Sequence, residues 1–126
     1  MNRRTSRALA IAICLALATV SPASAKGVEE RGRCSIGPGV WKIAVRSEDG
    51  GKLRVQFRIE HVPAGQRWQV FLSDNGARIF SGTRRANSSG EVHVTVFPTD
   101  RSGTDRIAAS AVNGGSGVVC EGSLAF

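Results

Sequence analysis

Side chains that could carry catalysis are few and scattered in this 126-residue chain. The two histidines, His61 and His93, lie far apart, and no Gly-x-Ser-x-Gly motif is present to supply the nucleophile of a Ser-His-Asp triad. The acidic side chains gather in turn-like segments such as those around Glu48 and Asp74, where carboxylates usually bond to backbone amides. Asp105 falls on an inward strand position, where we expect loop amides or an arginine to bind it. The residue pattern therefore predicts a protein that is not an enzyme and uses no metal or cofactor.

Cysteine usage indicates one disulfide bond rather than a metal site or a reactive thiol. Of the three cysteines, Cys14 belongs to a segment that we interpret below as a secretory signal, which leaves Cys34 and Cys120. Two cysteines without clustered histidines make a poor zinc site, whereas two cysteines in an exported chain usually pair. Closing so long a loop would stabilise the fold by about 4 to 5 kcal/mol in the chain-entropy model.

Basic side chains are the first candidate for binding. Five of them alternate with apolar residues in two neighbouring segments, and this alternation places them on one face of a β-hairpin, at Lys42, Arg46, Lys52, Arg54 and Arg58. His93 is expected on the neighbouring strand. Such a stripe is able to bind a polyanion such as a cell-wall glycopolymer, or anionic lipid. A solvated sheet face whose cations discourage edge pairing has the same pattern, so both interpretations stay open.

An aromatic pair is the second candidate. The strongest turn signal in the chain, Asn75-Gly76, predicts a two-residue hairpin turn, and the resulting register sets Phe71 opposite Phe80 on the outer face. A cross-strand aromatic pair adds up to about 1 kcal/mol to the stability of a hairpin. It would also form an exposed contact patch for a partner protein or a glycan.

The first 25 residues have the three-part pattern of a secretory signal peptide. Three arginines and no acid precede an apolar run from Ala8 to Val20, and Ala23-Ser24-Ala25 matches the small-x-small cleavage pattern. The apolar run is shorter than the roughly 20 residues that span a bilayer, so we predict no membrane span. Removing the three arginines lowers the formal net charge from +7 to +4. We expect the mature protein to be secreted, extracellular or associated with the cell envelope.

Period-two alternation of apolar and polar residues recurs through the mature chain, and no helical period is convincing. We predict a loose tail over residues 26–33 and one all-β domain over residues 34–126. Seven strands are expected, at 40–46, 52–60, 67–73, 77–83, 91–97, 105–112 and 117–125. Their spacing predicts a two-sheet antiparallel sandwich, with the first, second and fifth of these strands in one sheet and the other four in the second. A small barrel is the alternative.

Turn residues complete this prediction. Glu48-Asp49-Gly50 predicts a three-residue turn, and Gly114-Gly115 predicts the turn of the last hairpin. Gly37-Pro38-Gly39 interrupts the first strand, so residues 34–36 are able to cross toward the last strand, where Cys120 lies. The break and the disulfide therefore explain each other.

Two segments, GQRWQVFLSDNG (65–76) and RSGTDRIAASA (101–111), together with the paired end cysteines, resemble a group of small secreted proteins of actinobacteria. That group has an immunoglobulin-like or fibronectin-III-like sandwich and no assigned activity. The resemblance covers nearly all of the mature chain and rests on turn and core residues, so it implies a fold and no particular chemistry. The tyrosine of the usual immunoglobulin corner is absent, because the chain has no tyrosine.

Three hypotheses for function follow. In the first, the protein is a secreted, non-enzymatic immunoglobulin-like module that contacts an extracellular protein through Phe71 and Phe80. In the second, the basic face binds a polyanion or a cell-wall polymer. In the third, Arg84 and Arg85, in a loop over residues 83–90, inhibit an extracellular protease. Nucleic acid is not expected as a partner, because stacking residues are missing from the basic face. We expect a monomer.

Overall fold

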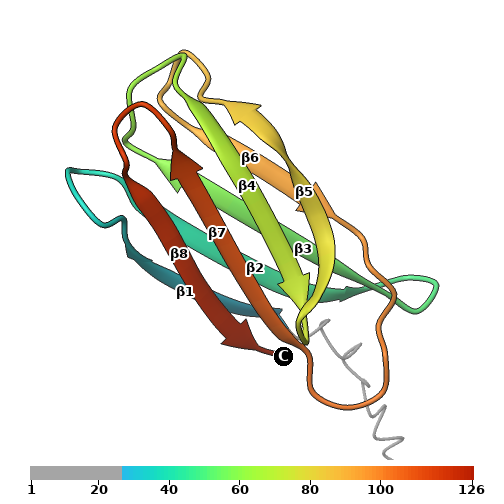
Figure 1. Cartoon of the computed structure of the whole chain (residues 1–126). Coiled ribbons are helices and arrows are strands. Elements are labelled where there is room, and N and C mark those ends of the chain that lie inside the picture. The colour runs from blue at the N-terminus through green and yellow to red at the C-terminus, as the bar shows by residue number, and fades with distance from the viewer. Residues whose placement is uncertain (1–26) are drawn as a thin grey trace, which may run out of the picture.

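The computed structural model describes residues 27–126, and every regular element within them is a β-strand (Figure 1). The signal peptide predicted over residues 1–25 lies outside the described residues. No helix in residues 27–126 is long and apolar enough to cross a membrane. The eight strands are β1 (Gly27–Arg33), β2 (Val40–Glu48), β3 (Lys52–Glu60), β4 (Arg67–Asp74), β5 (Ala77–Arg85), β6 (Val92–Val96), β7 (Arg106–Asn113) and β8 (Val119–Ala125).

The strands form two antiparallel sheets of four strands each. Sheet A has the order β1-β2-β3-β6, and sheet B has the order β5-β4-β7-β8. In Figure 1 sheet B lies in front of sheet A. The predicted all-β, two-sheet antiparallel sandwich is therefore confirmed, and the seven predicted strands are divided between the sheets as the alternation indicated. The difference is an eighth strand, β1.

The prediction of a loose tail over residues 26–33 is wrong, because β1 pairs with β2 along its whole length. The reason lies in two glycines. A Cβ atom built on Gly32 of β1 or on Gly122 of β8 would overlap the indole of Trp41, so the indole packs directly against both backbones. β1 thus gains its apolar contact from Trp41 and not from its own side chains, which explains its weak alternation.

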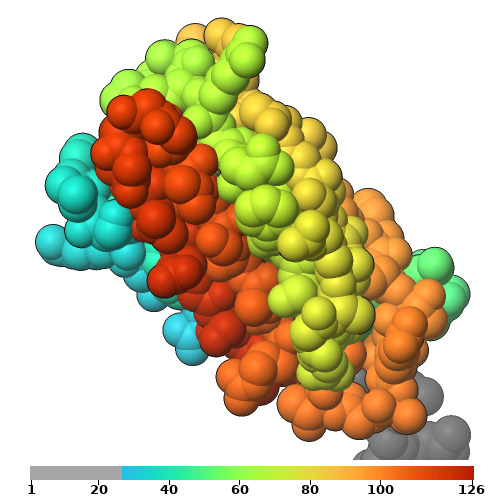
Figure 2. Space-filling model, in the orientation of Figure 1, coloured from blue at the N-terminus to red at the C-terminus, as the bar shows by residue number. Residues whose placement is uncertain are grey.

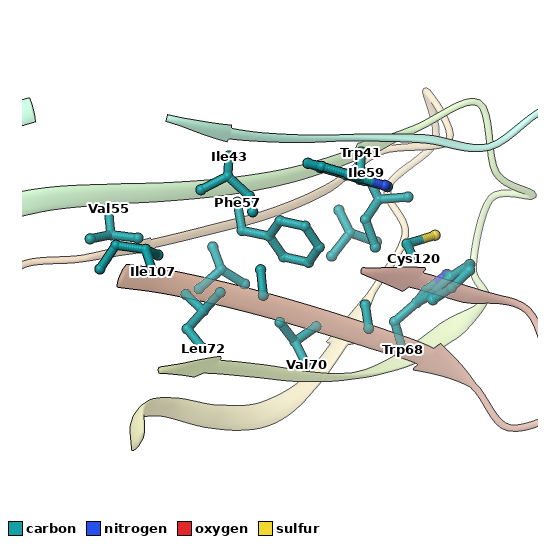
Figure 3. Close-up of a cluster of buried hydrophobic side chains, with 14 of the residues drawn as sticks. Trp41, Ile43, Val55, Phe57, Ile59, Trp68, Val70, Leu72, Ile107 and Cys120 are labelled. Carbon is teal, nitrogen blue, oxygen red and sulfur yellow. The ribbon is translucent and has the colours of Figure 1, made fainter. Parts of the chain in front are cut away.

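The core lies between the inner faces of the two sheets, as Figure 3 shows. Sheet A contributes Trp41, Ile43, Val45, Leu53, Val55, Phe57 and Ile59, and sheet B contributes Trp68, Val70, Leu72, Ile107, Ala109, Ala111 and Leu124. Burying one such large apolar side chain stabilises the fold by about 1.5 to 3 kcal/mol. The outer faces carry mostly polar, charged and small residues, with Phe71 on sheet B as an exception.

The first predicted turn is displaced by one residue. The three-residue turn is Asp49-Gly50-Gly51, and both of its glycines have positive φ (75° and 69°). Trp41 consequently pairs with Ile59. Because the register shifts by an even number of residues relative to the prediction, every side chain keeps its face.

A β-bulge changes the second hairpin. The predicted register holds only beside the Asn75-Gly76 turn, and it shifts at Leu72 because β5 carries one extra residue there. Phe80 therefore pairs with Leu72, and Phe71 pairs with Ser81. The prediction that Phe71 and Phe80 oppose each other is wrong.

The predicted disulfide joins Cys34 to Cys120, with 4.2 Å between their Cα atoms. The connection between β1 and β2 approaches β8 here, as predicted. The Ser35 amide donates a hydrogen bond to the Val119 carbonyl at 2.7 Å. The Val119 amide donates in turn to Ser35 Oγ at 2.9 Å. The link ties one end of sheet A to the last strand of sheet B.

Candidate functional site

The outer face of sheet A carries a row of basic side chains across all four strands. Register places Arg31 of β1 opposite Lys42 of β2, Lys42 opposite Arg58 of β3, and Arg58 opposite His93 of β6. Lys42 and Arg58 belong to the five cations expected on this face, and His93 lies beside them as expected. Arg31 is an addition, because it lies in the segment that was predicted to be a tail.

A second pair of cations lies nearer the β2–β3 turn. Arg46 pairs directly with Arg54, while Lys52 pairs with Glu48. The Nε atom of Arg54 is buried and has no hydrogen-bond acceptor among the described residues. Like charges directly opposite each other destabilise a sheet, so the Arg46–Arg54 pair lowers the stability of this face instead of adding to it.

Glutamates lie beside the basic row and neutralise much of it. Their shortest contacts are 2.7 Å for Arg31–Glu29, 3.4 Å for Lys42–Glu29, 3.1 Å for Arg58–Glu60 and 2.8 Å for His93–Glu91. The hydrogen bond from Arg31 lowers the pKa of Glu29, and the hydrogen bond with His93 lowers the pKa of Glu91. These two carboxylates are therefore ionised at neutral pH.

A hollow of about 300 Å³ opens on this face above Val40. Val40 is short, and its cross-strand neighbours are the long side chains of Arg33 on β1 and Glu60 on β3. The charged residues that line the hollow are Arg31, Arg33, Lys42, Arg58 and Glu60. Four cations and one carboxylate thus surround an apolar floor, an arrangement suited to an anion.

The sequence could have revealed part of what the prediction missed. Glu29, Arg31 and Arg33 stand at alternate positions, as on one face of a strand, and Gly32 between them allows close contact with a large side chain. The inner side of the segment carries Val28, Glu30 and Gly32, so one apolar residue in three positions was too weak a signal.

The outer face of sheet B, which Figure 2 shows, is different in character. A hollow of about 540 Å³ lies there beside Phe71, and small side chains of β7, Ala108 and Ser110, are part of its lining. The guanidinium carbon of Arg78 stands 4.7 Å from the centre of the Phe71 ring, and Glu121 lines the same hollow. The lining of this hollow contains one cation and one carboxylate, so the hollow has no dominant charge.

The predicted aromatic contact patch does not form. Phe71 is on the outer face of sheet B, whereas Phe80 pairs with inward-facing Leu72 and packs against the core. The Arg84 guanidinium carbon lies 4.8 Å from the centre of the Phe80 ring. Each ring therefore contacts its own arginine, and the two rings do not share a surface.

Arg84 and Arg85 do not lie in the predicted loop, because β5 continues to Arg85. The loop that follows is tied down by Asn87, whose side-chain oxygen accepts hydrogen bonds from two backbone amides at 3.0 Å. A loop inhibitor needs its basic residue on an exposed, protruding segment. Neither arginine is presented in that way.

A buried carboxyl pair lies at the end of sheet B. The Asp105 side chain, for which loop amides or an arginine were the expected partners, lies next to Asp74, with Asp100 nearby. Burial, followed by the contact with Asp74, raises the pKa of Asp105. Residues 27–126 contain no group of three or more histidine, cysteine, aspartate or glutamate side chains suited to a metal ion.

Comparisons of the chain with models of protein families, with curated proteins and with solved structures found no match. The geometry of the basic hollow on sheet A is therefore the strongest evidence on function that the molecule offers.

Proposed function

We propose that this protein is a secreted, non-enzymatic binding module that holds an anionic polymer, such as a cell-wall glycopolymer, on the outer face of sheet A. The observation that carries the proposal is the hollow above Val40, where cations from three neighbouring strands converge. The buried disulfide is compatible with an oxidising, extracellular location.

The distribution of strands supports an immunoglobulin-like or fibronectin-III-like module. If β2 to β8 are taken as strands A to G, strands A, B and E share one sheet and C, F and G the other, as in immunoglobulin constant domains. The fourth strand differs, because it pairs with the third and not with the fifth. Such modules commonly act by surface contact, and function must be argued from the site itself.

The hollow is well prepared for binding. Its cations stand on paired strands of one sheet, so little backbone order has to be gained when a ligand arrives. Three of the four are arginines, whose planar guanidinium groups bind anionic oxygens in pairs. A polymer would also reach Arg46 and Arg54 farther along the same face, which adds contacts without a second binding event.

The proposal is tested by binding to long-chain inorganic polyphosphate as a model polyanion. Replacing Lys42 and Arg58 together by glutamine should raise the dissociation constant about tenfold, because two contacts of roughly 0.7 kcal/mol each are lost. The matched control replaces Arg101 and Arg106, two exposed arginines outside sheet A, and should change binding little. Wild-type protein that does not bind polyphosphate at low salt would refute the proposal.

A further inference from the structure

We infer that the basic hollow selects phosphate-bearing polymers over carboxylate-bearing polymers, because the protein's own glutamates already occupy three of its four cations. This inference rests on the proposed function. In this inference Glu29 and Glu60 compete with the ligand for the cations of the hollow. Only a group that binds these cations more tightly than a carboxylate does displaces the two glutamates.

The contacts place both glutamates where they compete. Glu29 bridges two of the lining cations, at 2.7 Å from Arg31 and 3.4 Å from Lys42. Glu60 lines the hollow itself and lies 3.1 Å from Arg58. Their side chains are 41% and 30% exposed, so a ligand in the hollow is able to displace either one into water.

A carboxylate polymer gains little from this exchange. It offers the cations the same chemical group that Glu29 and Glu60 offer, while the glutamates are tethered beside them at a high effective concentration. Each exposed ion pair stabilises the protein by only about 0.2 to 1 kcal/mol. A ligand carboxylate that replaces a glutamate carboxylate forms an ion pair of the same strength as the one it breaks, so the exchange gives no net binding free energy.

A phosphate group gains more, because of its shape. Its oxygens point in several directions, so one group can accept hydrogen bonds from cations on different strands, whereas a planar carboxylate matches a single guanidinium fork. Arg31 on β1 and Arg58 on β3 flank Lys42, with one strand spacing of about 4.8 Å on each side. The row therefore presents donors from three neighbouring strands.

The surroundings of the hollow favour a soluble polymer over a membrane or a nucleic acid. The exposed large apolar residues among residues 27–126 are Val28, Ile36 and Phe97, and none of them lines the hollow. A rim without apolar anchors does not insert into a bilayer. The lining also has no exposed aromatic ring on which bases could stack.

The test compares long-chain polyphosphate with poly-L-glutamate of the same number of charges. Wild-type protein should bind polyphosphate at least about tenfold more tightly. The single variants Glu29→Gln and Glu60→Gln should each tighten poly-L-glutamate binding about two- to fivefold, since Glu60→Gln removes one competing ion pair and Glu29→Gln removes the two weak pairs that share its carboxylate. The control Glu121→Gln, exposed on the opposite face, should leave both affinities unchanged.

The outcomes separate the two proposals. Equal affinity for both polymers in the wild type, or glutamine variants that bind poly-L-glutamate no better, would overturn the selectivity while the polyanion function stands. Binding to neither polymer would overturn both. Capture by phosphatidylglycerol vesicles that polyphosphate does not compete would assign the face to a membrane instead. Glu60→Gln lies on β3, which is paired on both sides, so the test survives even if Glu29→Gln loosens the edge strand β1.

Discussion

On the outer face of sheet A, arginine and lysine side chains stand on β1, β2 and β3 and His93 stands on β6, and each member of the basic row has a glutamate within 3.4 Å. On the outer face of sheet B, the small side chains of β7 leave a hollow beside Phe71. This hollow is larger than the hollow on sheet A. The larger hollow nevertheless carries one cation and one carboxylate, while the smaller one gathers four cations and one carboxylate. Charge arrangement, and not the size of a depression, separates a candidate binding face from an ordinary one.

The two faces also depend differently on the ends of the molecule. The basic hollow needs β1, which sits on the edge of sheet A and is held through Trp41 and through the disulfide-linked connection that follows it. The hollow on sheet B is lined by the central strands β4 and β7 and by the edge strand β8, and none of its lining residues belongs to β1. Weakening β1 should therefore damage the hollow on sheet A before the hollow on sheet B.

The largest effect is expected from removing the disulfide. Replacing Cys34 and Cys120 by alanine should lower the free energy of unfolding by about 2 to 5 kcal/mol, because the unfolded chain is no longer closed into a long loop. Urea denaturation of the oxidised wild type and the double variant measures the difference. A variant as stable as the wild type would contradict the view that this link holds the two sheets together at the β1 side.

A smaller and more local effect is expected from Gly32→Val. The new side chain collides with the Trp41 indole, so overpacking should cost about 1 to 3 kcal/mol and loosen β1. Polyphosphate binding should fall because Arg31 and Arg33 leave the face. The matched control on the same strand is Gly27→Ala, whose added Cβ has its nearest neighbours at 3.7 and 3.8 Å and should be tolerated. Retained binding by Gly32→Val would show that the hollow does not need β1.

The smallest effects are expected from pH, and they have opposite signs in the two regions. The pKa of Asp105 is raised in the folded protein, so this group favours folding below its ordinary value of 3.8, and that contribution is lost as pH rises through the folded pKa. Asp105→Asn should accordingly raise the free energy of unfolding at neutral pH. Thermal unfolding of this variant from pH 4 to 7 checks the expectation, and an unchanged or lower stability at pH 7 would contradict it.

The sheet A face should respond to acid in the other direction. The pKa of Glu29 is lowered in the folded protein, so its contribution is present above its ordinary value of 4.5 and is lost as pH falls through the folded pKa. Glu29→Gln should therefore make stability less sensitive to acid below about pH 4.5. Because the pair is exposed, the change should also shrink at high salt. Acid and salt titrations followed by circular dichroism measure both effects.

Much of the fold could be predicted from alternation alone, because a strand's faces do not depend on the exact register. The first hairpin is shifted by two positions from its predicted pairing, yet Lys42 and Arg58 still share the outer face. The last hairpin behaves in the same way. There the Asn113 side chain accepts hydrogen bonds from the amides of Gly115 and Ser116, so the turn is longer than the predicted Gly114-Gly115 pair.

The features that could not be predicted are those decided by contacts distant in sequence. β1 forms because Trp41 and Gly32 fit together, and the alternation of Glu29, Arg31 and Arg33 around Gly32 gives only a weak local sign of it. The bulge at Leu72 inserts one residue into β5 and turns Phe80 toward the core, which no local turn rule anticipates. The candidate site was therefore foreseen in its β2 and β3 residues and missed in its β1 residues.

The most direct test of the central claim is an NMR titration of the wild-type protein with long-chain polyphosphate, followed at every assigned backbone amide. We expect the largest shift changes along residues 31–33, 40–42 and 58–60, around the basic hollow, with little change along residues 108–110 and 121–123. Changes confined to the second set, on the outer face of sheet B, would contradict the assignment of anion binding to sheet A.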